Sequence, residues 1–159
     1  MDVASLAGNL AATPWDWTPD GNDAVLRSAG WSPAEEKGTR RSYERDGYRL
    51  SAYREGDRVV RLEVTVAAAL PDPDDEWQDD LIDEYYARWE QVTGEVAEVL
   101  GKPRYSDGRG NRGYPADQTA EWASVWPRDG FRVMVTQTHE DKELPFRINV
   151  VCAPGDPRL

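Results

Sequence analysis

The feature that most restricts the fold of this chain is a change in the spacing of its apolar residues near position 74. Residues 60–66 alternate apolar with polar side chains, which is the period of a half-buried β-strand. Residues 74–100 instead place apolar side chains three and four positions apart, as on one face of a helix. This face consists of Trp77, Leu81, Tyr85, Trp89, Val92, Val96 and Val99. The pattern predicts a strand that ends before Pro71, followed by a long helix.

The rest of the sequence predicts two short helices and five further strands. One helix is expected over residues 3–12, and a second begins at Pro19 with Thr18 as its N-cap. Asp46-Gly47 predicts a two-residue turn between two strands, because such a turn needs positive φ angles. The further strands are expected over residues 40–45, 48–54, 119–126, 131–138 and 146–152, with loops over residues 32–39 and 106–118.

This order of elements, α-α-βββ-α-βββ, predicts a single α+β domain over residues 1–159. Consecutive hairpins favour an antiparallel sheet of about six strands, with the long amphipathic helix packed on it. The one cysteine, Cys152, excludes an intrachain disulfide and fits a reducing compartment. The N-terminal residues lack the basic region of a secretory signal, and no apolar run is long enough to span a bilayer. We therefore expect a cytoplasmic protein that is monomeric when free.

Acidic residues are concentrated in one segment of the chain. Residues 71–100 hold eleven acids and one base, so they account for −10 of the total net charge of −11. The densest part contains eight of these acids: Asp72, Asp74, Asp75, Glu76, Asp79, Asp80, Asp83 and Glu84. The helix dipole favours acids in a first turn, but the effect fades beyond that turn. We predict that these eight residues bind a basic protein, the alternative being an ordinary solvated acidic face. Nucleic acid and anionic membrane are not expected partners.

The sequence contains no motif that specifies a chemical reaction. Gly108, Gly110 and Gly113 form a G-x-G-x-x-G pattern, but no strand precedes it and no helix follows it, so we interpret it as a loop. The acids after Pro71 lack the spacing and the glycine of a calcium loop. His139, the only histidine, is expected to be a solvated turn residue. We expect no catalytic residue, no cofactor and no metal ion, and we do not expect an enzyme.

The chain has seven tryptophans. Trp77 and Trp89 lie on the apolar side of the long helix, and Trp122 and Trp126 lie on one face of a strand. Helix-on-sheet packing would bring these four together, so we predict that they belong to the core. Two other regions are alternative interfaces if the acidic segment binds nothing: Trp15 with Trp17, and Arg109 with Arg112.

Three segments carry a resemblance to a known group of proteins: TPWDWTPDGNDAVLRSAGW, LGKPRYSD and TAEWASVW. Together they resemble a family of small acidic actinobacterial proteins of unassigned function, which often accompany secreted polymorphic toxins as candidate immunity proteins. The resemblance implies an immunity-type protein (an antitoxin) that binds and neutralises a cationic toxin domain, possibly a nuclease. A secretion or folding chaperone for an effector protein is the first alternative, and an enzyme of unknown reaction is the second.

Overall fold

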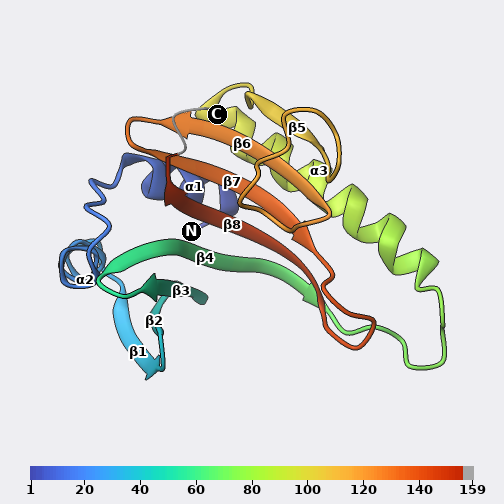
Figure 1. Cartoon of the computed structure of the whole chain (residues 1–159), viewed down its shortest axis with the longest axis horizontal. Helices are drawn as coiled ribbons and strands as arrows, with labels where there is room; N and C mark the ends of the chain where they lie inside the picture. Colours follow the sequence, from blue (N-terminus) through green and yellow to red (C-terminus); the bar gives the residue numbers. More distant parts are fainter. Residues whose placement is uncertain (156–159) are drawn as a thin grey trace.

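The computed structural model describes residues 1–155, which form an α+β domain with helices packed on a twisted sheet (Figure 1). Within those residues there are three helices: α1 (Val3–Ala12), α2 (Pro19–Ser28) and α3 (Asp79–Leu100). The strands are β1 (Ser32–Lys37), β2 (Arg40–Arg45), β3 (Tyr48–Glu55), β4 (Arg58–Ala69), β5 (Tyr105–Gly108), β6 (Trp122–Arg128), β7 (Phe131–Thr138) and β8 (Phe146–Pro154). They form one antiparallel sheet in the order β1-β2-β3-β4-β8-β7-β6-β5. The predicted fold class and antiparallel sheet are confirmed.

Two meanders make up the sheet, and their last strands pair at its centre. β1–β4 and β5–β8 each run as consecutive antiparallel neighbours. β4 pairs with β8 from Leu62 opposite Cys152 to Ala69 opposite Phe146. α3 joins the two meanders and packs across one face of the sheet, so helix and sheet share one core.

The described residues contain eight strands, so the prediction of about six was wrong. The two strands that were predicted as loops, β1 and β5, are the edges of the sheet. Every residue of β1 is exposed, and β5 is only four residues long. An edge strand pairs through its backbone, and neither strand carries the alternating apolar pattern by which a strand is recognised in a sequence.

Several strands lie where the sequence predicted them, and the β2–β3 hairpin does so because of its turn residues. Asp46 and Gly47 have φ angles of 50° and 81°, which gives the expected tight turn between β2 and β3. β7 occupies the predicted residues 131–138. In β4, however, Val59 is buried and Val60 only half-buried, because an irregularity in the β3–β4 pairing shifts the alternation there.

The helical layer consists of α1 and α3, which pack against each other and against the sheet. α3 buries Tyr85, Trp89, Val92 and Val96. The Trp89 indole Nε1–H donates to the Val135 carbonyl at 3.2 Å and so ties the helix to the centre of the sheet. At the other end of α3, the Trp126 indole Nε1–H donates to the Gly101 carbonyl at 2.7 Å. The predicted core roles of Trp89 and Trp126 are confirmed, and Trp122 is half-buried beside Trp89.

The predicted start of the long helix and the predicted burial of Trp77 were both wrong. α3 begins at Asp79 rather than Asp74, and the Trp77 side chain is 72% exposed. The cause is Gln78, which adopts a left-handed conformation with φ 53°. This conformation prevents α3 from extending backwards from Asp79 to Trp77. Trp77 therefore lies in a loop, outside the apolar stripe in which the sequence pattern had placed it.

A long loop covers part of the sheet face opposite the helices. Tyr105 packs against a small second apolar cluster made by Val125, Met134, Val151 and Ala153, and the Tyr114 ring of loop 109–121 lies 6.1 Å from the Tyr105 ring. The buried Arg132 guanidinium holds this loop, since its Nη atoms donate to the two Asp117 carboxylate oxygens at 2.9 and 2.5 Å. The loop that follows the G-x-G-x-x-G pattern is thus anchored at Asp117, whereas residues 109–113 of the pattern are exposed.

Candidate partner-binding surface

All eight predicted partner-binding acids lie together at one end of the molecule. Residues 70–84, called here the acidic end, comprise the loop after β4 and the first turns of α3 (Figure 1). The eight carboxylates are exposed: Asp72, Asp74, Asp75, Glu76, Asp79, Asp80, Asp83 and Glu84. The β7–β8 turn, residues 139–145, lies at the same end, because Ala69 of β4 pairs with Phe146 of β8.

The loop of the acidic end is held in shape by Gln78. Its side chain is 5% exposed, and its amide Oε1 accepts from the Asp72 backbone N–H at 2.9 Å. Its Nε2 donates to the carbonyls of Asp72 and Asp75. The Asp75 carboxylate in turn accepts the backbone N–H groups of Trp77, at 3.1 Å, and of Gln78, at 3.2 Å. These bonds turn the acidic side chains and Trp77 outward on a closed loop.

Large apolar side chains are exposed among these acids. Leu70 is 76% exposed, Trp77 72% and Ile82 48%. Leu144, in the adjoining β7–β8 turn, is 45% exposed. A single exposed apolar residue is ordinary, but several large ones at one end of a domain are typical of an interaction surface. Sequence reasoning missed Leu70 and Ile82, and it assigned Trp77 to the core.

The charge of the acidic end is almost uncompensated. Of its eight acids, only Glu84 forms an ion pair within residues 1–155, with Arg88 at 3.0 Å. The Arg88 guanidinium also lies 5.5 Å from the centroid of the Tyr85 ring. The remaining seven carboxylates form no ion pair with a described residue, and their negative field raises the rate at which a cationic partner is encountered.

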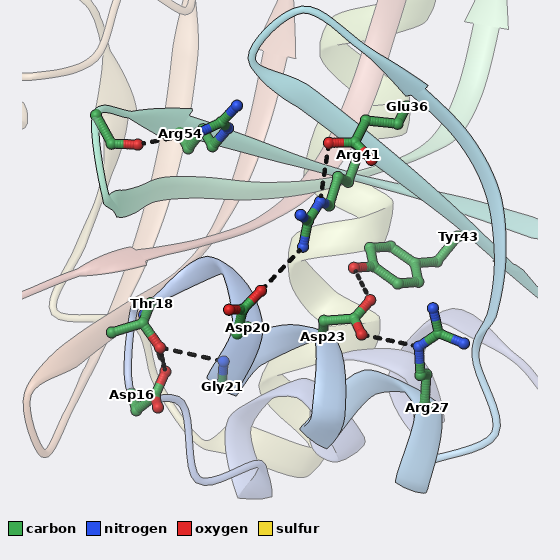
Figure 2. Close-up of polar contacts among 11 residues, drawn as sticks. Asp16, Thr18, Asp20, Gly21, Asp23, Arg27, Glu36, Arg41, Tyr43 and Arg54 are labelled. Atoms are coloured by element: carbon green, nitrogen blue, oxygen red, sulfur yellow. Dashed lines mark hydrogen bonds and ion pairs between the residues drawn. The ribbon is translucent and has the colours of Figure 1, made fainter.

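A second candidate site is the polar cavity between α2 and the β1–β2 hairpin, of about 410 Å³ (Figure 2). Here the Tyr43 hydroxyl donates to Asp23 at 2.6 Å, and Arg27 donates to the same carboxylate at 2.8 Å. Burial and the Asp23 carboxylate raise the pKa of Tyr43 well above its ordinary value. The hydrogen bonds from Tyr43 and Arg27 lower the pKa of Asp23 despite its partial burial. The phenol therefore stays protonated and the carboxylate stays ionised near neutral pH, and their hydrogen bond ties β2 to α2.

The tryptophans near the start of α2 also have structural roles. The Trp15 indole Nε1–H donates to the Leu10 carbonyl at 3.0 Å, and Trp17 is 6% exposed with its ring 6.2 Å from that of Phe131. Trp17 has a φ of 61°, which a buried Asn22 stabilises by accepting the backbone N–H groups of Asp16 and Trp17, each at 3.2 Å. These contacts assign Trp15 and Trp17 to the fold rather than to a free surface.

The other side chains singled out from the sequence are dispersed. Arg109 pairs with Glu121 at 3.4 Å, and Arg112 lies exposed in the same loop. His139 is not the solvated turn residue that was expected. Its ring stacks on Phe146 with centroids 3.8 Å apart, and its buried Nε2 has no hydrogen-bond partner among the described residues. The end of β7 places this ring against the core, which the sequence pattern did not indicate.

A metal centre and a membrane-spanning helix are both absent from the described residues. In residues 1–155, no three His, Cys, Asp or Glu side chains converge to hold a metal ion. No helix of the same residues is long and apolar enough to cross a membrane.

Comparison with known proteins identifies a family but no activity. Neither the curated proteins nor the solved structures include a match to the chain. One family model matches residues 1–139, which is most of the sequence, and its description is "Family of unknown function (DUF6301)". The chain therefore belongs to the DUF6301 family.

Proposed function

We propose that this protein binds and neutralises a basic protein partner, a toxin domain of the producing cell, through its acidic end. One observation carries the proposal: seven carboxylates that form no ion pair with a described residue share one end of the domain with the exposed side chains of Leu70, Trp77 and Ile82. A face that only interacts with water needs no exposed tryptophan. Carboxylates would steer and orient a cationic partner, and the apolar side chains would supply the desolvated contacts that slow its release.

The roles of the two kinds of residue are separable. The acids act over a distance of about 8 Å at 0.15 M salt, so they govern chiefly the association rate. Trp77 acts only in contact, where a buried tryptophan is a frequent hot spot, with a loss of about 2 kcal/mol or more on truncation. That loss corresponds to a dissociation constant about 30-fold higher. These two roles support the binding of a basic protein. The choice of a toxin domain as that protein rests on the resemblance of the sequence to candidate immunity proteins.

The test begins with a partner captured by the immobilised protein from lysate of the producing cell and identified by mass spectrometry. Binding kinetics of the purified pair are then measured for Trp77→Ala and for a variant with Asp79, Asp80 and Asp83 changed to Asn and Glu84 changed to Gln. Val99→Ala is the matched control, because Val99 is 51% exposed at the opposite end of the same helix.

The expected result is that Trp77→Ala raises the dissociation constant about 30-fold or more, mainly through faster dissociation. The variant with four acids changed to amides should associate more slowly with the partner. Its association rate should also depend less on salt concentration than that of the wild type. The control should bind normally, and at equal concentrations toxin activity should be blocked more strongly by the wild type and the control than by either variant. Unchanged kinetics in both variants would contradict the proposal, and binding only to an unfolded segment of the partner would favour a chaperone.

A further inference from the structure

A groove next to the acidic end has the composition of a site for a cationic side chain. It lies between α3 and the β5–β6 edge of the sheet and has a volume of about 320 Å³. Six of its lining residues matter to the argument: Tyr86, Trp89, Glu90, Gly94, Asp107 and Trp122. The lining contains two carboxylates and no lysine or arginine.

The apolar wall of the groove consists of three aromatic rings. The Tyr86 and Trp122 rings meet edge to face with centroids 4.6 Å apart, and the Trp89 ring lies 5.4 Å from that of Trp122. The Trp89 indole N–H is already bonded to Val135 in the interior. Tyr86 and Trp122 are only half-buried, so parts of their rings remain open to the groove. Electron-rich ring faces attract a guanidinium or ammonium group within about 6 Å.

Two carboxylates flank these rings. Glu90 accepts the Tyr86 hydroxyl at 2.8 Å, and this hydrogen bond is the main cause of the raised pKa of Tyr86. One Asp107 oxygen accepts the Gly108 backbone N–H at 2.7 Å and the Asn111 amide at 2.8 Å. Both carboxylates are thus held in place by uncharged donors, and neither forms an ion pair with a described residue.

Hydroxyl groups line the groove between the rings and the β5 strand. The side-chain oxygens of Thr93 and Ser106 each lie 2.9 Å from that of the buried Ser124. Thr93 and Ser106 both line the groove, so their oxygens are available as further acceptors. A planar guanidinium has five N–H donors and stacks on aromatic rings, which matches a site made of rings, carboxylates and hydroxyls better than a compact ammonium does.

The groove continues the acidic end along α3. Residues spaced three and four apart share one face of a helix, and Asp79, Asp83, Tyr86 and Glu90 follow this spacing. Arg88 lies about half a turn away from this line and pairs with Glu84. A partner that docks on the acidic end therefore meets the groove next.

We propose that the groove between α3 and β5–β6 binds an arginine side chain of the basic protein partner. The proposal rests on the proposed function for the source of the arginine, whereas the site itself is a property of this chain. The guanidinium would stack against Tyr86 and Trp122 and would be neutralised by Glu90 and Asp107. The partner would thus be anchored at two places, by Trp77 in one and by its own arginine in the other.

Gly94 allows the groove to be closed without a steric clash. It lines the groove in the middle of α3, and a Cβ atom added there would meet no atom within 4 Å. Leucine at this position would occupy the groove and would also favour the helix, because glycine is a poor helix former. Gln91→Leu is the matched control, because it introduces the same side chain at an exposed position of α3 that does not line the groove.

The site can be tested without the partner. The probe is the blocked tripeptide acetyl-Gly-Arg-Gly-amide, and the readout is the chemical shift of the assigned Trp122 and Trp89 indole N–H groups in the folded full chain. The matched uncharged probe carries citrulline in place of arginine. We expect saturable shifts with the arginine peptide, at an affinity on the order of 1 mM. The affinity should be lost in Gly94→Leu, about tenfold weaker in Glu90→Gln, and unchanged in Gln91→Leu.

Several results would overturn the inference. Equal shifts with the citrulline peptide would show that charge is not recognised, and shifts that survive Gly94→Leu would place the peptide elsewhere. Tighter binding of free spermidine than of the peptide would assign the groove to a polyamine instead. If Gly94→Leu is unfolded, Glu90→Gln still decides, since an unchanged affinity in that variant is incompatible with the site. A different result would separate the two proposals. If the arginine peptide binds the groove but Trp77→Ala leaves partner binding unchanged, the acidic end is contradicted as the docking site and the arginine site is not.

Discussion

The ion pair between Arg132 and Asp117 gives the clearest prediction about stability. Arg132 has a side chain only 3% exposed, whereas the Asp117 side chain is 52% exposed. The guanidinium also donates to the Pro154 carbonyl at 3.1 Å, but its Nε has no partner among the described residues. Removing the carboxylate would leave a buried cation with the Pro154 carbonyl as its remaining acceptor among residues 1–155.

The two halves of this pair are therefore expected to differ when they are truncated. Loss of one partner from a fully buried pair costs about 3–5 kcal/mol. Because Asp117 is half-exposed and water replaces part of its contribution, we expect Asp117→Ala to cost about 2–3 kcal/mol. For a domain of this size that lowers the melting temperature by about 5–10 °C. Arg132→Met removes the buried charge and keeps the apolar stem, while Asp117 becomes hydrated, so we expect a cost within about 1 kcal/mol.

The effect of Asp117→Ala should also depend on pH. The hydrogen bonds from Arg132 are the main cause of the lowered pKa of Asp117. A carboxylate whose pKa is lowered in the folded state stabilises that state at pH values above 3.8, the ordinary pKa of an aspartate. This contribution is lost as the pH falls through the lowered pKa. The difference in unfolding free energy between wild type and Asp117→Ala should be constant near neutral pH and should shrink below about pH 4.

Urea unfolding at 25 °C, followed by tryptophan fluorescence at several pH values, measures these quantities. Hydrogen exchange would locate the change, which is expected in loop 109–121 before the central strands. A cost below about 0.5 kcal/mol for Asp117→Ala would refute the reasoning, because a surface pair has that value. So would a larger cost for Arg132→Met than for Asp117→Ala, since the buried charge would then be stabilising in itself.

Two further predictions concern the fold. A Cβ atom on Gly21 would overlap the Asp16 carboxylate, and Asp16 is held there by the N–H and hydroxyl of Thr18, at 2.9 Å each. Gly21→Ala should therefore destabilise the wild type by about 1–2 kcal/mol but stabilise an Asp16→Ala background, where helix propensity alone acts; thermal unfolding of the four proteins tests this reversal of sign. Cys152 is fully buried, and burial raises its pKa to about 12, so a thiol reagent at pH 8 should label it only in urea, and labelling of the native protein would contradict its burial.

Much of the fold was predictable because several segments contain local signals strong enough to act alone. Thr18 and Pro19 start α2 as expected, with the Thr18 hydroxyl accepting the Gly21 N–H at 3.1 Å. Asp46-Gly47 determines its turn through backbone conformation rather than through tertiary contacts. The edge strands β1 and β5 were not predictable in this way, because each pairs with the next strand through backbone groups that any residue provides.

The candidate site was only partly predictable, for a different reason. The positions of the eight acids could be predicted as exposed, because unpaired carboxylates avoid burial. The role of Trp77 could not, because its spacing from Leu81 matches a helical stripe even though Gln78 interrupts the helix between them. A buried glutamine whose side-chain amide bonds to the backbone of the preceding loop has no periodic signature. Two prolines and four acids within Pro71–Glu76 were the available indication that the helix starts later.

The segments that carry the family resemblance contribute mainly to the fold rather than to the acidic end. Two tryptophans of these segments contribute to the fold. Trp17 adopts a positive φ, and the Trp126 indole donates to the Gly101 carbonyl and so holds the C-terminal end of α3. The opposite end of α3 carries the acids and lies outside all three segments, so substitutions there leave those contacts intact. The groove differs in this respect, because Asp107 and Trp122 belong to the resembling segments. A relative that keeps these two residues is therefore expected to keep the arginine site, even where the charge at the N-terminal end of its long helix has changed.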